Sequence, residues 1–102
     1  MESLIQNLQR TIRALETLSE KKLPESEQVD ELLDQLFQHK IDLVNINISS
    51  SSPVYQQAVQ AMSQAANRVE KAVKEPSQTA DAVPVVYDAV SRLAKLLNHV
   101  MP

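Results

Sequence analysis

The sequence contains no glycine, no cysteine and no tryptophan, and it has one phenylalanine and two tyrosines. Tight hairpin turns need glycine, and β-strands are rich in aromatic residues, so both shortages argue against a β fold and favour helices. The absence of glycine also excludes glycine-dependent phosphate loops and the nucleophile elbow of hydrolases. The absence of cysteine excludes disulfides, thiolate zinc sites and cysteine nucleophiles.

Positive charge is also scarce. Ten lysines and arginines are spread along the chain, and the net charge is −3. Because nucleic-acid backbones are bound by clustered basic side chains, we expect no nucleic-acid partner. Uninterrupted apolar runs are only a few residues long, so we expect no membrane partner either. Residues 1–6 lack the basic and apolar regions of a signal peptide, and we therefore expect a cytoplasmic protein.

The overall composition is that of an ordinary globular protein. The apolar fraction is 43% and the charged fraction is 23%, both close to the average for soluble domains. A chain of 102 residues is long enough for one hydrophobic core but too short for two. We therefore expect residues 1–102 to form a single domain.

Three prolines divide the chain into four segments of comparable length. Pro24, Pro53 and Pro76 separate segments that each carry apolar residues at the three-four spacing of an amphipathic helix. Short connections make consecutive helices run in opposite directions. The expected fold is therefore all-α, an antiparallel up-down-up-down four-helix bundle. A three-helix bundle is the alternative, because residues 44–48 alternate apolar and polar side chains and could leave the helix.

Two pairs of residues mark helix starts. Ser3 and Gln6 have the spacing of a capping box, in which each side chain bonds the backbone of the other residue. Ser52 followed by Pro53 is typical of an N-cap and the first helical residue. We expect helices to begin at both places.

The last segment contains a proline that limits where its helix can begin. Pro84 is tolerated only in the first helical turn, so we expect this helix to begin near Asp81, with residues 77–80 as a connection. The apolar repeat of the segment leaves Val85 and Leu96 on the outer side of the helix.

The second segment is the least regular of the four. Four of its apolar residues share one direction on a helical wheel and are expected to face the core: Val29, Leu33, Leu36 and Val44. Lys40 and Asn47 fall within the same arc. Ile41, Ile46 and Ile48 lie outside it. Regular amphipathicity therefore ends near Lys40.

This irregularity predicts a protein-binding surface in the C-terminal half of the second segment. A single core-facing stripe cannot accept all of the apolar residues there, and those left in water would be available to a partner. We predict that the following residues contact a partner: Lys40, Ile41, Leu43, Ile46, Asn47 and Ile48. The alternative is that a bend in the helix tucks these residues into the end of the bundle.

The two histidines offer little chemistry. Di-metal bundles carry glutamate three residues before each ligating histidine, whereas Leu36 precedes His39 and Leu96 precedes His99. His39 stands next to Lys40, and a phosphotransfer bundle uses an exposed histidine beside a lysine that steadies the phosphoryl charge. A histidine phosphotransfer or metal-binding bundle that uses His39 is therefore the alternative function. We predict no catalytic, cofactor-binding or metal-binding residues.

The second segment also carries most of the negative charge. Glu27, Glu31 and Asp34 share one helical face at spacings of four and three. Carboxylates on one exposed face, without carbonyl ligands from a loop, bind calcium or magnesium weakly. We expect this face to be solvated.

These observations favour a small protein that is not an enzyme and acts through protein–protein interaction. An adaptor, a secretion-type chaperone, a regulator and an immunity-like inhibitor all fit this description. The partner would be another protein or a second copy of the chain in a homodimer. A structural domain of a larger assembly is a further alternative.

Overall fold

The computed structural model describes residues 3–45 and 52–100, the last two of these as backbone only. The described residues contain four α-helices and one short 3-10 turn. The elements are α1 (Leu4–Ser19), α2 (Ser26–Val44), α3 (Pro53–Lys74), η1 (Pro76–Gln78) and α4 (Thr79–Val100). None of these helices is long and apolar enough to cross a membrane.

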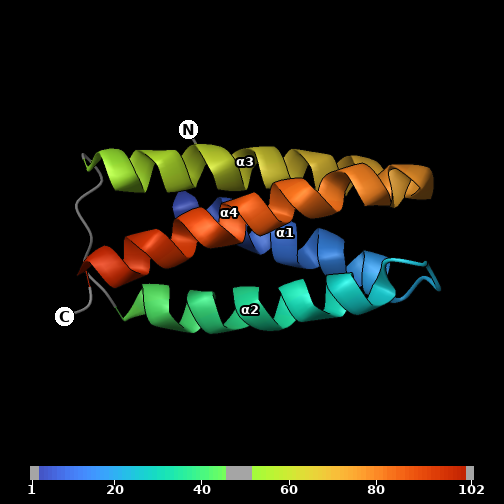
Figure 1. The fold of residues 1–102 in the computed structure, drawn as a ribbon, viewed down its shortest axis with the longest axis horizontal. Helices are drawn as coiled ribbons and strands as arrows, with labels where there is room; N and C mark the ends of the chain where they lie inside the picture. Colours follow the sequence, from blue (N-terminus) through green and yellow to red (C-terminus); the bar gives the residue numbers. More distant parts are fainter. Residues whose placement is uncertain (1–2, 46–51, 101–102) are drawn as a thin grey trace.

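The four helices pack as a bundle in which consecutive helices run in opposite directions (Figure 1). The predicted four-helix bundle is therefore confirmed. Helix α1 packs against α2 and α3, and α4 packs against the same two helices. Consequently α2 and α3 are diagonal to each other, although they follow one another in the sequence. Helix α2 lies along one edge of the bundle in Figure 1.

The predicted capping box is present at the start of α1. The backbone N–H of Gln6 donates to Ser3 Oγ at 3.2 Å, and the backbone N–H of Ser3 donates to Gln6 Oε1 at 2.8 Å. Helix α3 begins as predicted, with Ser52 as its N-cap residue and Pro53 as its first residue. The Ser52 side chain makes no capping hydrogen bond, so the fixed φ angle of proline is the stronger start signal here.

Helix α4 begins at Thr79, earlier than the predicted start near Asp81, and Pro84 lies inside the helix. Thr79 is fully buried and Ala82 is nearly so, and their burial holds the first turn against the bundle. Proline cannot bond the carbonyl four residues before it. That carbonyl belongs to Ala80, an exposed residue, so water can replace the lost hydrogen bond.

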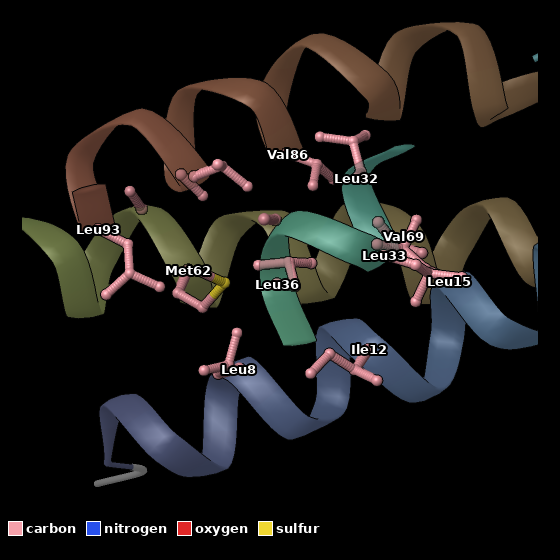
Figure 2. Packing of buried hydrophobic residues seen from close by; sticks show 14 of the residues in the cluster. Leu8, Ile12, Leu15, Leu32, Leu33, Leu36, Met62, Val69, Val86 and Leu93 are labelled. Carbon is pink, nitrogen blue, oxygen red and sulfur yellow. The ribbon is translucent and has the colours of Figure 1, made fainter. Parts of the chain in front are cut away.

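The core lies between all four helices, and its side chains point toward one another from each of them (Figure 2). The labelled residues are Leu8, Ile12 and Leu15 of α1, Leu32, Leu33 and Leu36 of α2, Met62 and Val69 of α3, and Val86 and Leu93 of α4. A closed apolar core of this kind is the main source of stability for a small helical domain.

Small side chains dominate the buried face of α3. Its buried residues are Ala58, Ala61, Met62, Ala65, Ala66, Val69 and Ala72. Short side chains allow neighbouring backbones to approach closely. Accordingly, the backbone of α3 lies close to those of α4 and α1 over longer stretches than is the case for any other pair of helices in the bundle.

The buried face of α4 is wider than its sequence repeat indicated. Leu96, expected on the outer side, is fully buried, and Val85 is half-buried. The reason is that α4 packs against both α2 and α3, so residues on two neighbouring stripes of the helix reach the core.

Candidate functional site

The strongly exposed large apolar side chains in the described part of the chain all belong to α2. Phe37 is 42% exposed, Ile41 is 55% exposed and Val44 is 64% exposed. Their spacings of four and three place them on one face of the helix over about two turns. We call these three residues the apolar stripe.

The core-facing residues of α2 explain why the apolar stripe is left outside. Leu36 is fully buried and Leu43 is 7% exposed, and their spacing of seven residues keeps both toward the bundle. Leu43, which is predicted to contact a partner, therefore packs in the core of the bundle. It continues the inward stripe, and Val44, which was expected to face the core, is exposed instead.

The predicted surface residues have different locations in the structure. Ile41 is exposed, as expected, and Lys40 is half-buried. Ile46, Asn47 and Ile48 lie outside the described residues. Ile41 is therefore not tucked into the end of the bundle.

Sequence reasoning did not single out Phe37 and Val44 as surface residues. The signal was present in their spacing, because Phe37, Ile41 and Val44 form a second three-four repeat beside the core-facing one. A helix with two such repeats has more apolar surface than one core can cover.

Exposed carboxylates continue the line of the apolar stripe toward the N-terminus of α2. Glu27, Asp30 and Asp34 follow spacings of three and four, and Asp34 stands three residues before Phe37. All three carboxylates are exposed, as is Glu31, which confirms the expected solvated face. We call Glu27, Asp30 and Asp34 the acidic stripe.

The carboxylates of the acidic stripe do not converge on one point. Within residues 3–45 and 52–98, no group of three or more histidine and carboxylate side chains is arranged to hold a metal ion. Carboxylates one helical turn apart on an exposed face are hydrated separately and repel one another. Their combined effect is a negative field along the first half of α2.

His39 lies on α2 between the two inward-facing leucines. Its side chain is half-buried, and its buried Nδ1 has no hydrogen-bond partner. Burial of the imidazole lowers the pKa of His39, and the nearby Asp42 carboxylate opposes this shift. A neutral imidazole is therefore favoured in the folded protein. The proposed phosphotransfer role of His39 stays a prediction.

A second polar cluster joins α1 to α3. Arg10 donates from Nε to Glu70 Oε2 at 3.1 Å and from Nη2 to Glu70 Oε1 at 2.6 Å. It also donates to Asn67 Oδ1 at 2.8 Å and to Asn7 Oδ1 at 3.3 Å. The Arg10 hydrogen bond holds the pKa of Glu70 below its usual range. This bidentate pair links the parallel helices α1 and α3.

An open groove of about 440 Å³ lies beside this cluster between α1 and α3. It is lined by side chains of both charges, including Arg13, Glu70 and Lys74. Glu70 already balances Arg10. The other charged side chains of the groove, Arg13 and Lys74, are both exposed, and two exposed cations beside an open groove do not define one class of ligand. The α2 surface is therefore the stronger candidate site.

Comparison of the chain with known protein families, with curated proteins and with solved structures finds no match.

Proposed function

We propose that this protein is a non-enzymatic protein-binding module and that the apolar stripe of α2 is its docking surface. The observation that carries the proposal is the gathering of Phe37, Ile41 and Val44 on one exposed helical face. Single exposed apolar residues are ordinary in soluble proteins, but three aligned ones form a continuous patch.

The energetics of burial support this proposal. Each member of the apolar stripe keeps roughly half of its surface in water. Covering that surface is worth about 1 kcal/mol for each residue, because a large apolar side chain gains about 1.5 to 3 kcal/mol on full burial. A partner helix that covers all three would gain a useful part of its affinity here, with Phe37 as the aromatic anchor.

Affinity capture from the cells that naturally produce the protein tests the proposal. The full chain, its Ile41→Asp variant and its Gln64→Asp variant would each serve as bait, and the captured partner would be identified and quantified. Gln64 is exposed on α3, so Gln64→Asp adds the same charge away from the stripe.

We expect a stoichiometric partner that binds the wild type and Gln64→Asp equally and is lost with Ile41→Asp. In the complex, a carboxylate at position 41 would lose its hydration and find no cation or hydrogen-bond donor to replace it. This cost would weaken binding strongly. A partner retained in full by Ile41→Asp would show that the docking surface lies elsewhere. Sedimentation of the purified protein would reveal whether that partner is a second copy of the chain.

A further inference from the structure

We infer that the partner of α2 is an amphipathic helix with apolar residues in its N-terminal turns and lysine or arginine in its C-terminal turns, bound antiparallel to α2. This inference rests on the proposed protein-binding function and specifies the chemistry of the partner. It follows from the way the apolar stripe and the acidic stripe share one face of α2.

The two stripes form one continuous seam along α2. Glu27, Asp30, Asp34, Phe37, Ile41 and Val44 follow the repeating spacing of three and four, and all six are exposed. This is the spacing with which one helix meets another along a shared seam. The seam covers about 26 Å of helix, at about 1.5 Å per residue. The N-terminal half of the seam is acidic and the C-terminal half is apolar.

The apolar stripe alone is too small for a stable complex. A specific interface buries about 800 Å² on each partner, and three partly exposed side chains supply only part of that area. A helical partner that lies along α2 would bury further area by continuing onto the acidic stripe. Basic side chains are the complement of three exposed carboxylates, because like charges at an interface are strongly disfavoured.

The charge pattern of the seam disfavours α2 of a second copy of the chain as the bound helix. Two copies in parallel would place the acidic stripes against each other. Two copies in antiparallel would place the carboxylates of one copy on Phe37, Ile41 and Val44 of the other, which would bury charges against apolar side chains. In neither arrangement do both the acidic stripe and the apolar stripe meet side chains that complement them.

The orientation of the partner follows from helix dipoles. In an antiparallel arrangement the partner's basic residues lie in its own C-terminal turns, where cations are favourable. Its apolar residues then lie in its N-terminal turns, opposite the C-terminal half of α2. Of the acidic stripe, Glu27 lies in the first turn of α2, where its charge is also favourable.

Synthetic helical peptides of about 20 residues can test this inference by calorimetric titration into the full chain. The first peptide carries leucine at three-four spacing in its N-terminal half and lysine at the same spacing in its C-terminal half. A second peptide has glutamate in place of lysine. A third has the two halves in reverse order.

We expect the first peptide to bind about 10-fold more tightly than the second, because three exposed charge pairs each contribute modestly. The difference should shrink at high salt. The reversed peptide should bind more weakly than the first, since it can pair the seam only in parallel.

Two sets of variants assign the binding to the seam. Removing the acidic stripe with Glu27→Gln, Asp30→Asn and Asp34→Asn should abolish the preference for the basic peptide. A matched control removes three exposed carboxylates outside α2, with Glu16→Gln, Glu20→Gln and Glu75→Gln, and should keep the preference. Ile41→Asp should abolish binding of every peptide.

Equal binding of the basic and acidic peptides, lost in both cases with Ile41→Asp, would overturn the basic partner while leaving the docking surface intact. Absence of binding by every peptide would also overturn the basic partner. The capture experiment judges the protein-binding function independently of either result.

Discussion

His39 and Lys40 occupy the positions on α2 between Leu36 and Leu43, where a continuous apolar core would place another large apolar residue. Both are half-buried instead. The imidazole loses hydration there, and its Nδ1 gains no hydrogen bond in return. A polar side chain at this position therefore lowers the stability of the bundle.

The His39→Leu substitution should raise the free energy of unfolding by about 1 kcal/mol at pH 7, because it removes the buried unbonded nitrogen and adds a better helix former. It should also change the pH dependence. In the wild type the pKa of His39 is lowered by folding, so the unfolded chain takes up a proton first as the pH falls below about 6.5. The free energy of unfolding of the wild type therefore decreases as the pH falls from about 6.5 to the pKa of His39 in the folded protein.

Urea unfolding at several pH values between 5 and 7 checks this prediction. His39→Leu should flatten the loss of stability over that range. Gln28→Leu, the same kind of change at an exposed position of α2, should leave the pH dependence as in the wild type. A His39→Leu variant that is less stable than the wild type, with an unchanged pH dependence, would contradict the proposed environment of His39.

At the scale of the helices, the sequence predicted the number of helices and several of their ends correctly. Prolines, the Ser3–Gln6 capping box and the Ser52–Pro53 pair are local signals that act within one turn, so they can be recognised without a partner helix. The width of a buried face is not a local property. It depends on how many neighbours a helix packs against, which is why the burial of Leu96 was missed.

Leu96→Ala tests the wide buried face of α4. We expect a loss of about 2 to 5 kcal/mol in the free energy of unfolding, because a fully buried leucine leaves a cavity. Val85→Ala is the matched comparison, since Val85 is only half-buried, and it should cost about 1 kcal/mol or less. Equal small effects from both variants would show that Leu96 lies on the outer side after all.

Helix α2 shows why only part of the candidate surface could be predicted. The mismatch between its apolar content and one core-facing stripe is visible in the sequence, and it identifies Ile41 as a residue outside the core, which is exposed in the structure. A helical wheel does not say where the bundle lies, however, so it assigns Val44 to the core, whereas the structure buries Leu43 and exposes Val44. The contacts of α2 with α1 and α4 decide that direction.

At the scale of the whole molecule, α2 and α3 lie diagonally across the bundle and differ in how closely they pack against α1 and α4. Helices α3 and α4 approach each other most extensively, with alanines on the buried face of α3. Helix α2 packs against α1 and α4 and leaves its remaining apolar residues in water. The bundle is therefore closed around its core while one helix keeps an apolar outer face.

Equilibrium urea unfolding of Ile41→Asp and Leu43→Asp tests this central claim most directly, because the two residues are neighbours on α2 with opposite environments. We expect Ile41→Asp to stay within about 1 kcal/mol of the wild type, as an exposed substitution does. Leu43→Asp should lose about 3 to 5 kcal/mol or fail to fold, because it places a carboxylate in the core. If Ile41→Asp unfolds the protein as severely as Leu43→Asp, the outer face of α2 is buried and the proposed docking surface does not exist.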